Sequence, residues 1–133
     1  GFFGTPRMNL SIAKVTEENG SVVLKFSSGT IPLSEKKGKL LRELGYVGKE
    51  VFTGVRPDKV APAKNGENGE ITGELIGGEE IDDAPYIRFR VGENEFLAKA
   101  EGGENLTGKK MSFKISGDNV YLFDKETEKI IAE

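Results

Sequence analysis

Eighteen glycines are spread along the 133 residues of this chain without a fixed repeat. This is about twice the average glycine usage, and glycine at that density usually marks tight turns. Many turns in a short chain predict many short strands. The residues between the turns agree, because apolar and polar side chains alternate, most clearly where Met111, Phe113 and Ile115 alternate with serine and lysine. The chain is therefore predicted to be all-β.

The turns divide the chain into short apolar stretches that fit strands. Strands are expected over residues 8–15, 22–26, 30–33, 49–55, 70–76, 86–91, 95–100, 111–115 and 120–123. Residues 61–69 indicate a loop between a first half, residues 1–60, and a second half, residues 70–133, which together form one domain. This pattern is typical of one or two OB-fold-like β-barrels.

One short helix is expected over residues 34–44. Ser34 is a good N-cap residue, and Gly45 is a good residue to end the helix. Its apolar stripe is predicted to consist of Leu40, Leu41 and Leu44.

The residue types that are missing limit the chemistry of the chain. It has no cysteine, which excludes disulfides and thiolate metal sites, and no histidine, which removes the usual general base at neutral pH. The net charge of −3 argues against a nucleic-acid backbone as partner. No apolar run is long enough to span a membrane and no signal peptide opens the sequence, so a cytosolic protein is expected. No catalytic, cofactor-binding or metal-binding residue is predicted.

Two segments resemble binding loops but fit them poorly. Residues 103–110 nearly match a phosphate-binding loop, but Lys110 cannot supply the hydroxyl that such loops use to hold Mg²⁺, and a strand pattern follows where a helix should begin. Residues 67–83 contain seven carboxylates and no lysine or arginine. Their spacing does not fit a calcium-binding EF-hand loop, so we predict a solvated acidic loop that protects a sheet edge.

Tyr86, Arg88 and Arg90 share one face of a predicted strand. An aromatic residue with two arginines on an OB-type sheet is a pattern that reads single-stranded nucleic acid. Because the neighbouring stretch is acidic, we instead predict an exposed face with cross-strand partners such as Glu93 or Glu95.

The first residues are unusually apolar for a natural N-terminus and lack an initiator Met. We therefore expect a seam with a longer protein. Phe2, Phe3, Pro6 and Met8 are expected to form an apolar patch, which packs against the domain's own barrel or serves as an interface. The sequence leaves both alternatives open.

Four segments then stand out in order along the chain: Gly-Phe-Phe-Gly-Thr-Pro-Arg-Met-Asn at residues 1–9, Gly-Val-Arg-Pro-Asp at 54–58, Gly-Glu-Leu-Ile-Gly at 73–77 and Tyr-Leu-Phe-Asp at 121–124. Together they resemble motifs of the ATP-binding subunits of sugar ABC importers of the maltose and multiple-sugar type. Two positions depart from the family pattern, since Gly73 replaces the usual Val and Asp58 the usual Glu. The acidic residues 79–83 resemble a divergent loop.

The resemblance implies that this is the C-terminal regulatory and dimerisation domain of such a subunit, a TOBE-type OB fold without enzyme activity of its own. It implies that ATP and Mg²⁺ bind to a missing N-terminal domain, so that the full-length parent is an ABC transporter ATPase. The implied partners are a second copy of the subunit, the transporter membrane subunits reached through the missing domain, and a regulatory protein. The implied location is the cytoplasmic face of the cell membrane. The motif residues are candidates for interface positions: Phe2, Phe3, Pro6, Met8, Asn9, Gly54, Arg56, Pro57, Asp58, Glu74, Gly77, Leu122, Phe123 and Asp124.

Two expectations accompany this interpretation. Arg56 is expected to anchor a strand end by hydrogen bonds to backbone or carboxylate oxygens, and Pro57 to fix the turn. The isolated chain is expected to be a monomer or a weak dimer, since stable interfaces usually bury more than about 1,000 Å². The alternatives are a free-standing OB-type module that binds single-stranded nucleic acid or a small oxyanion, and a carboxylate-based hydrolase.

Overall fold

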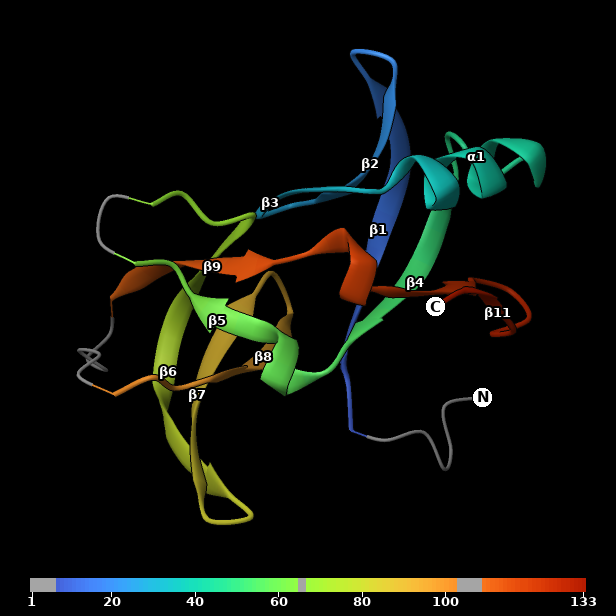
Figure 1. Cartoon of the computed structure of the whole chain (residues 1–133). Coiled ribbons are helices and arrows are strands. Elements are labelled where there is room, and N and C mark those ends of the chain that lie inside the picture. Colours follow the sequence, from blue (N-terminus) through green and yellow to red (C-terminus); the bar gives the residue numbers. More distant parts are fainter. Residues whose placement is uncertain (1–6, 65–66, 103–108) are drawn as a thin grey trace.

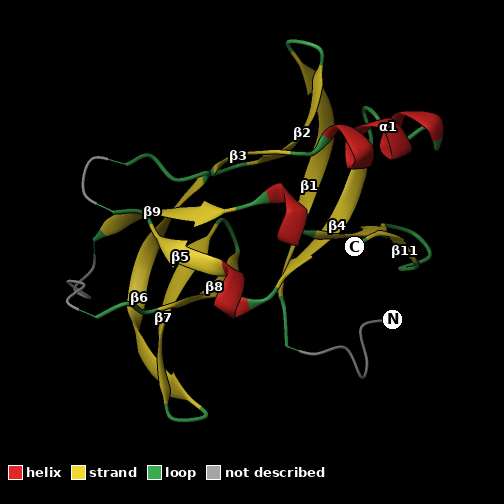
Figure 2. Cartoon of the chain, in the orientation of Figure 1, coloured by secondary structure: helices red, strands yellow, loops and turns green. Residues whose placement is uncertain are grey.

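The computed structural model describes residues 7–64, 67–102 and 109–133. The described ranges form a curled sheet of strands with a single α-helix at the edge of the molecule and two short 3-10 helices (Figures 1 and 2). The elements are β1 (Asn9–Glu18), β2 (Ser21–Phe26), β3 (Gly29–Pro32), α1 (Glu35–Glu43), β4 (Glu50–Val55), η1 (Pro57–Lys59), β5 (Val60–Pro62), β6 (Ile71–Ile81), β7 (Ala84–Val91), β8 (Asn94–Lys99), β9 (Lys110–Ile115), η2 (Gly117–Asn119), β10 (Tyr121–Asp124) and β11 (Ile130–Ala132). The all-β prediction is confirmed, while β5 and β11 were not expected.

The strands form one continuous antiparallel sheet that curls on itself. Its order is β11-β10-β4-β1-β2-β3-β6-β7-β8, and β9 joins both β5 and β6. Strand β10 pairs with β4 and β11 pairs with β10, so the end of the chain adds to the strands of the first half (Figure 1). No helix within the described ranges is long and apolar enough to cross a membrane.

A single apolar core fills the inside of the curled sheet. The ring of Phe89 on β7 stacks on the ring of Phe113 on β9, with centroids 3.7 Å apart. The ring of Phe96 on β8 packs edge-on against the Phe89 ring, with centroids 5.7 Å apart. Leu24 and Val15 are fully buried on the β1–β2 hairpin. The core therefore draws on strands from both halves of the sequence.

The helix begins and ends as expected, because the Ser34 side chain accepts a hydrogen bond from the Lys37 amide and Gly45 adopts a positive φ of 79°. The predicted stripe is wrong at Leu44, which is 55% exposed. The buried face instead carries Lys37, Gly38 and Leu41. Glycine at position 38 lets the helix approach β2, since a Cβ there would lie 3.1 Å from the Val22 Cβ.

Lys37 is buried because its ammonium group caps the second 3-10 helix. Its Nζ donates hydrogen bonds to the carbonyl oxygens of Gly117 (2.9 Å), Asp118 (3.3 Å) and Val120 (2.8 Å). Burial lowers the pKa of Lys37, and the nearby Asp118 carboxylate opposes this effect. One side chain thus joins α1 to a segment 80 residues later in the sequence.

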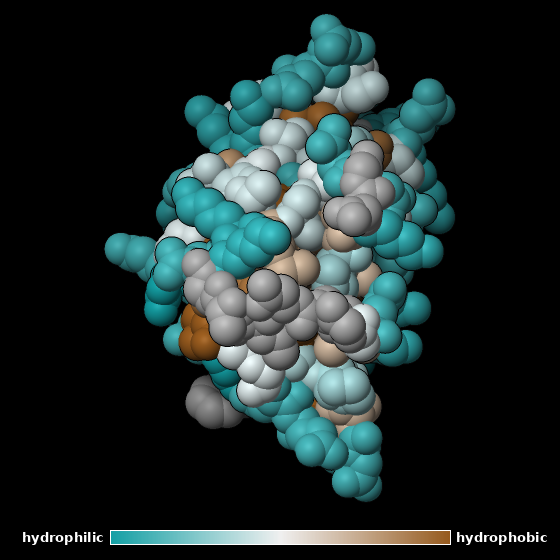
Figure 3. All heavy atoms as spheres, turned by 90° about the vertical axis from the view of Figure 1, so that its left-hand side faces the viewer, coloured by the Kyte–Doolittle hydropathy of each residue, from teal (hydrophilic) through white to brown (hydrophobic). Residues whose placement is uncertain are grey.

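The predicted strand over residues 70–76 is confirmed, but residues 77–81 extend it where an acidic loop was predicted. Residues 71–81 form β6, which pairs with β7 and turns at Asp82 and Asp83 with positive φ values of 50° and 64°. The carboxylates of Glu74 and Glu79 face arginines on β7, which explains why an acidic segment forms a strand. On the side of the molecule that is on the left in Figure 1, apolar residues show only as small separate spots among hydrophilic ones (Figure 3).

Candidate interaction groove

Strand β1 carries apolar residues on both of its faces. Its buried positions are Asn9, Ser11, Ala13 and Val15, whereas Leu10 is half-buried and Ile12 is 41% exposed on the outer face. Residues directly opposite each other in an antiparallel pair share a face, and Ile12 lies opposite Phe52 of β4. An apolar strip therefore runs across the outside of the sheet.

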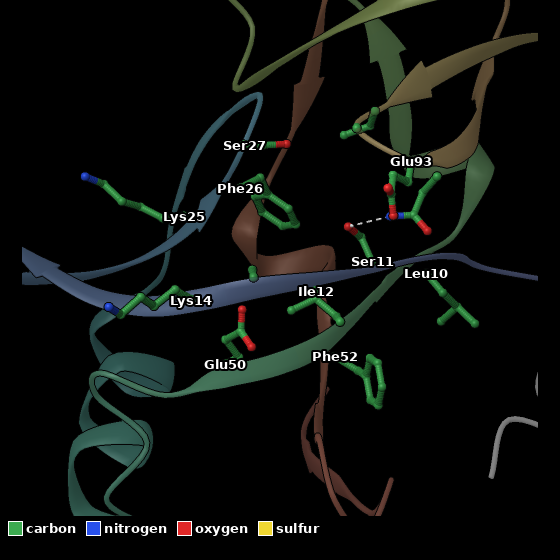
Figure 4. A pocket seen from close by; sticks show the side chains of 14 residues that line it. Leu10, Ser11, Ile12, Lys14, Lys25, Phe26, Ser27, Glu50, Phe52 and Glu93 are labelled. Atoms are coloured by element: carbon green, nitrogen blue, oxygen red, sulfur yellow. Dashed lines mark hydrogen bonds between the residues drawn. The ribbon is translucent and has the colours of Figure 1, made fainter.

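Residues of this strip line an open hollow of about 650 Å³ (Figure 4), which we call the interaction groove. The other lining residues come from β1, β2 and β4 and from the β7–β8 hairpin. The groove is lined by Leu10, Ser11, Ile12, Ala13, Lys14, Lys25, Phe26, Ser27, Glu50, Phe52, Val91, Gly92, Glu93 and Asn94.

Asn9 holds the two sides of the groove together. Its Nδ2 donates to the Leu97 carbonyl oxygen at 2.8 Å, and its Oδ1 accepts from the Leu97 amide at 2.7 Å. Nearby, the Asn94 Nδ2 donates to the Ser11 Oγ at 3.4 Å. Because Asn9 is only 4% exposed, its amide must find partners inside the protein. These bonds fix β8 against β1 across 88 residues of sequence.

The β7–β8 turn places Glu93 at one end of the groove. The turn has two residues, and Gly92 takes the positive φ of 58° that the first position of such a hairpin turn commonly adopts. A Cβ at position 92 would lie 3.3 Å from the Ser27 Oγ. Glycine therefore lets the turn settle closely over the end of β2.

Charges of opposite sign lie at the two ends of the groove (Figure 4). Lys14 and Lys25 lie at one end, beside Glu50, and Glu93 lies at the other. Lys25 pairs with Glu18 at 2.9 Å, and Glu50 accepts a hydrogen bond from Lys125 at 2.6 Å, which lowers the pKa of Glu50. Within the described ranges, Lys14 and Glu93 form no ion pair. An apolar floor with charged ends suits contact with another protein surface.

Three of the four motif segments meet beside this groove. Met8 packs closely against Gly54. A Cβ atom added at position 54 would lie 2.8 Å from the Met8 Sδ and 3.4 Å from the Phe123 ring. Gly54 also lies opposite both Leu10 and Tyr121 in the sheet. Phe2, Phe3 and Pro6 lie outside the described residues.

The second motif ends β4 and begins η1. The Arg56 guanidinium lies over the Tyr121 ring, 5.7 Å from its centroid. Among the described residues no hydrogen bond from this guanidinium is found, so the expected hydrogen-bond anchor stays a prediction. Pro57 occupies the first turn of η1, and Asp58 is exposed. The arginine thus ties β4 to the motif on β10 through a cation–π contact.

The closing motif is held from several sides. Leu122 is fully buried and Phe123 is 8% exposed. The Asp124 carboxylate accepts hydrogen bonds from the amides of Thr127 and Glu126 and from the Tyr46 hydroxyl at 2.7 Å, and these bonds lower its pKa to about 2.

The remaining motif lies on β6, away from the groove. Glu74 pairs with Arg90 at 3.6 Å, and the register of β6 and β7 shifts between Leu75 and Gly77. Arg88 pairs with Glu79 and with Glu95 at 3.1 Å. The predicted pairing with Glu95 is confirmed, so acidic neighbours offset the charge of this arginine face.

Sequence reasoning did not single out Ile12, Lys14 or Phe26 for an interaction surface, and it named Glu93 only as a cross-strand partner of the arginine face. A signal for Ile12 was the alternation of Leu10 and Ile12 with Asn9, Ser11 and Ala13. The near-match to a phosphate-binding loop falls mostly at residues 103–108, outside the described residues. Its last residue, Lys110, begins strand β9. In the described ranges no cluster of three or more acidic side chains could hold a metal ion.

Comparison with known proteins identifies the fold of the first half. Residues 4–60 match the family model of the MalK OB fold domain. These residues are therefore similar to the MalK OB fold domain. The predicted OB-like fold class and the resemblance to sugar-importer ATP-binding subunits are both confirmed.

Several relatives match the chain along nearly its whole length. The oligosaccharides import ATP-binding protein MsmX of Bacillus subtilis is 29% identical over 96% of the chain and 35% of its own length. The trehalose/maltose import ATP-binding protein MalK of Thermococcus litoralis is 32% identical over 98% of the chain and 36% of its own length. The multiple sugar-binding transport ATP-binding protein MsmK of Streptococcus mutans is 26% identical over 98% of the chain. The chain spans about a third of the length of these curated relatives.

Proposed function

We propose that this chain is the C-terminal regulatory and dimerisation domain of the ATP-binding subunit of a carbohydrate ABC importer. The observation that carries the proposal is the match of 96–98% of the chain to ATP-binding proteins of sugar importers. The MalK OB fold match over residues 4–60 supports it. In this proposal ATP and Mg²⁺ bind to a nucleotide-binding domain of the same polypeptide, and the membrane subunits contact that domain. The subunit then works at the cytoplasmic face of the cell membrane.

The architecture supports a contact role. Long-range hydrogen bonds from Asn9 and Lys37 fix strands and helices that are distant in sequence. A domain held this way keeps its surface in one arrangement while other parts of a transporter move. Its contribution is then a rigid contact surface that helps two ATP-binding subunits stay together.

The experiment is a test of transport in the organism that carries the gene. Deletion of the gene that encodes this chain is expected to abolish uptake of one class of carbohydrate, and the intact gene is expected to restore it. A gene that lacks only residues 7–133 is expected to restore less uptake than the intact gene, although its ATP-binding residues remain. Unchanged uptake of every carbohydrate tested after gene deletion would contradict the proposal.

Binding of a small oxyanion is a second candidate function, favoured by one observation. Among the described residues, the buried Ser28 Oγ has no hydrogen-bond partner. It lies in a shallow hollow with Ser27, Thr72, Arg90 and Lys110. Glu74 lies in the same hollow and opposes an anion. Thermal unfolding with sulfate, phosphate and molybdate tests this candidate, because a bound anion must raise the melting temperature.

A further inference from the structure

We propose that Asn19, at the tip of the β1–β2 hairpin, is a deamidation site, where the folded chain slowly converts this asparagine into aspartate and isoaspartate. The reaction uses the chain's own backbone as nucleophile and water as the co-reactant. The inference goes beyond the proposed function and does not depend on it.

The tip of the hairpin is an exposed two-residue turn. Asn19 and Gly20 lie between the paired strand ends Glu18 and Ser21, where the hairpin projects from the sheet (Figure 1). Both turn residues have a positive φ, 53° for Asn19 and 81° for Gly20, and both are exposed. This is the geometry of a type I′ turn, for which Asn-Gly is a preferred pair. A Cβ added at position 20 would meet nothing within 4 Å, so the space beside the Gly20 backbone is open.

The Gly20 backbone nitrogen is the nucleophile. Among the described residues its amide has no hydrogen-bond acceptor, and glycine carries no side chain that would hinder its attack. The nitrogen forms a bond to the Asn19 Cγ, the bond from Cγ to Nδ2 breaks, and Nδ2 leaves as ammonia with the proton of the Gly20 amide. The product is a five-membered succinimide ring.

Water then opens this ring at either of its two carbonyl carbons and returns a proton to the Gly20 nitrogen. Opening at Cγ gives aspartate at position 19, and opening at the main-chain carbon gives isoaspartate. In both products a carboxylate replaces the amide of Asn19, so the chain gains a negative charge and the mass that the exchange of nitrogen for oxygen brings.

The chain contains a second site that serves as a matched reference. Residues 67–69 repeat the Glu-Asn-Gly of residues 18–20, and Asn68 is exposed like Asn19. The local sequence around the reacting atoms is therefore the same at both sites. A third Asn-Gly pair, at residues 65–66, lies outside the described residues.

The two sites differ in how the structure holds the glycine. The Gly69 amide donates a hydrogen bond to the Ser112 Oγ at 2.6 Å, whereas the Gly20 amide donates none within the described ranges. A Cβ at position 69 would collide with the backbone of Phe113, so Gly69 packs closely against β9. The Gly69 nitrogen must give up its bond and leave β9 before it can attack. The structure thus protects Asn68 and leaves Asn19 reactive.

The products alter the hairpin in two ways. Aspartate places a third carboxylate next to Glu17 and Glu18. Isoaspartate routes the main chain through Cβ and Cγ, which adds a backbone atom to a turn of two residues. The Arg42 Nη2 donates to the Gly20 carbonyl oxygen at 2.8 Å, and this contact between α1 and the hairpin depends on the turn geometry. The stored chain is therefore expected to unfold at a lower temperature than the fresh chain.

The test is peptide mapping by mass spectrometry of the 133-residue chain during storage at neutral pH. The folded chain is expected to deamidate at Asn19 at least about fivefold faster than at Asn68, because only the second site must first release a hydrogen bond. In concentrated urea neither glycine is held, and the two rates are expected to become similar. Fragmentation spectra distinguish aspartate from isoaspartate at each position.

Two variants separate the effect of structure from that of sequence. Ser112→Ala removes the acceptor of the Gly69 amide and is expected to raise the rate at Asn68 about fivefold, with the rate at Asn19 unchanged. Asn19→Gln keeps an amide but lengthens the side chain beyond a five-membered ring, and is expected to stop the reaction at this turn and most of the fall in melting temperature. Circular dichroism of the fresh chains verifies that both variants fold.

The inference is overturned if Asn19 stays intact in the folded chain while it reacts in urea, or if Asn68 reacts as fast as Asn19 in the folded chain. An unchanged rate at Asn68 in the Ser112→Ala variant would equally refute the argument from the Gly69 amide. None of these results depends on sugar transport. Failure of this test therefore leaves the proposed function intact, and failure of the uptake experiment leaves the deamidation result intact.

Discussion

The Asn9 amide connects the two sides of the groove, and its removal offers a sharp test of the structure. Asn9→Ala deletes the hydrogen bonds at 2.8 and 2.7 Å to the backbone of Leu97. Both Leu97 groups then stay buried without these partners, because Leu97 is only 4% exposed. Water cannot easily replace the lost amide at such a site.

The expected loss follows from these two bonds. A buried backbone group that loses its partner costs about 1–3 kcal/mol, so two such groups give a loss of about 3 kcal/mol in the free energy of unfolding. For a domain of this size the melting temperature should fall by roughly 10 °C. Asn68→Ala, at an exposed loop position, is the matched control and should change the free energy by less than about 0.5 kcal/mol.

Urea unfolding of the three chains measures the difference, and hydrogen exchange locates it. The Leu97 amide of the Asn9→Ala variant should exchange much faster than in the original chain. A loss below about 1 kcal/mol, within the range of an ordinary solvent-exposed bond, would refute the argument that Asn9 bridges β1 and β8.

Three other changes test separate parts of the fold. Lys37→Met should destabilise the chain by about 2–4 kcal/mol, because three carbonyl oxygens lose their donor, and an unchanged urea midpoint would contradict the bonding of α1 to η2. Asp124→Asn should lower the free energy of unfolding at neutral pH, and the loss should shrink as the pH falls from about 3.8 to about 2. The reason is that the lowered pKa makes the carboxylate stabilising only while it is ionised. Urea unfolding measures the loss, and an equal loss at every pH would count against this reasoning. Gly54→Ala should cost about 1 kcal/mol through overpacking against Met8, and Met8→Ala in the same chain should relieve that cost in thermal unfolding; strictly additive losses would show that the two residues do not touch.

The sequence was sufficient where the signals were local. The helix start at Ser34 and its end at Gly45 depend on neighbouring residues, and both were predicted correctly. The alternation of Tyr86, Arg88 and Arg90 with buried residues is likewise a property of one strand. The four motifs indicated the family, although the structure brings only three of them together.

The failures come from long-range partners. Sequence analysis did not single out Lys37, whose ammonium group donates hydrogen bonds to three carbonyl oxygens 80 or more residues away. Asn9 faces inward for the same reason, through Leu97. With Asn9 facing inward, the alternation of the strand places Leu10 and Ile12 on the outer face of β1.

Strand β6 shows how paired charges override composition. A strand is expected from the sequence only as far as residue 76, and the acidic residues beyond it indicate a loop because residues 67–83 contain no lysine or arginine. The compensating charges lie on β7, where Arg88 and Arg90 meet Glu79 and Glu74. The short strands β5 and β11 have only three residues each, too few for a periodic signal.

The most direct measurement compares ATP hydrolysis by the intact gene product with that of the 133-residue chain alone. If the chain is a contact domain of an importer subunit, the intact polypeptide hydrolyses ATP and the chain by itself does not. An intact polypeptide that neither binds nor hydrolyses ATP would contradict the proposed function.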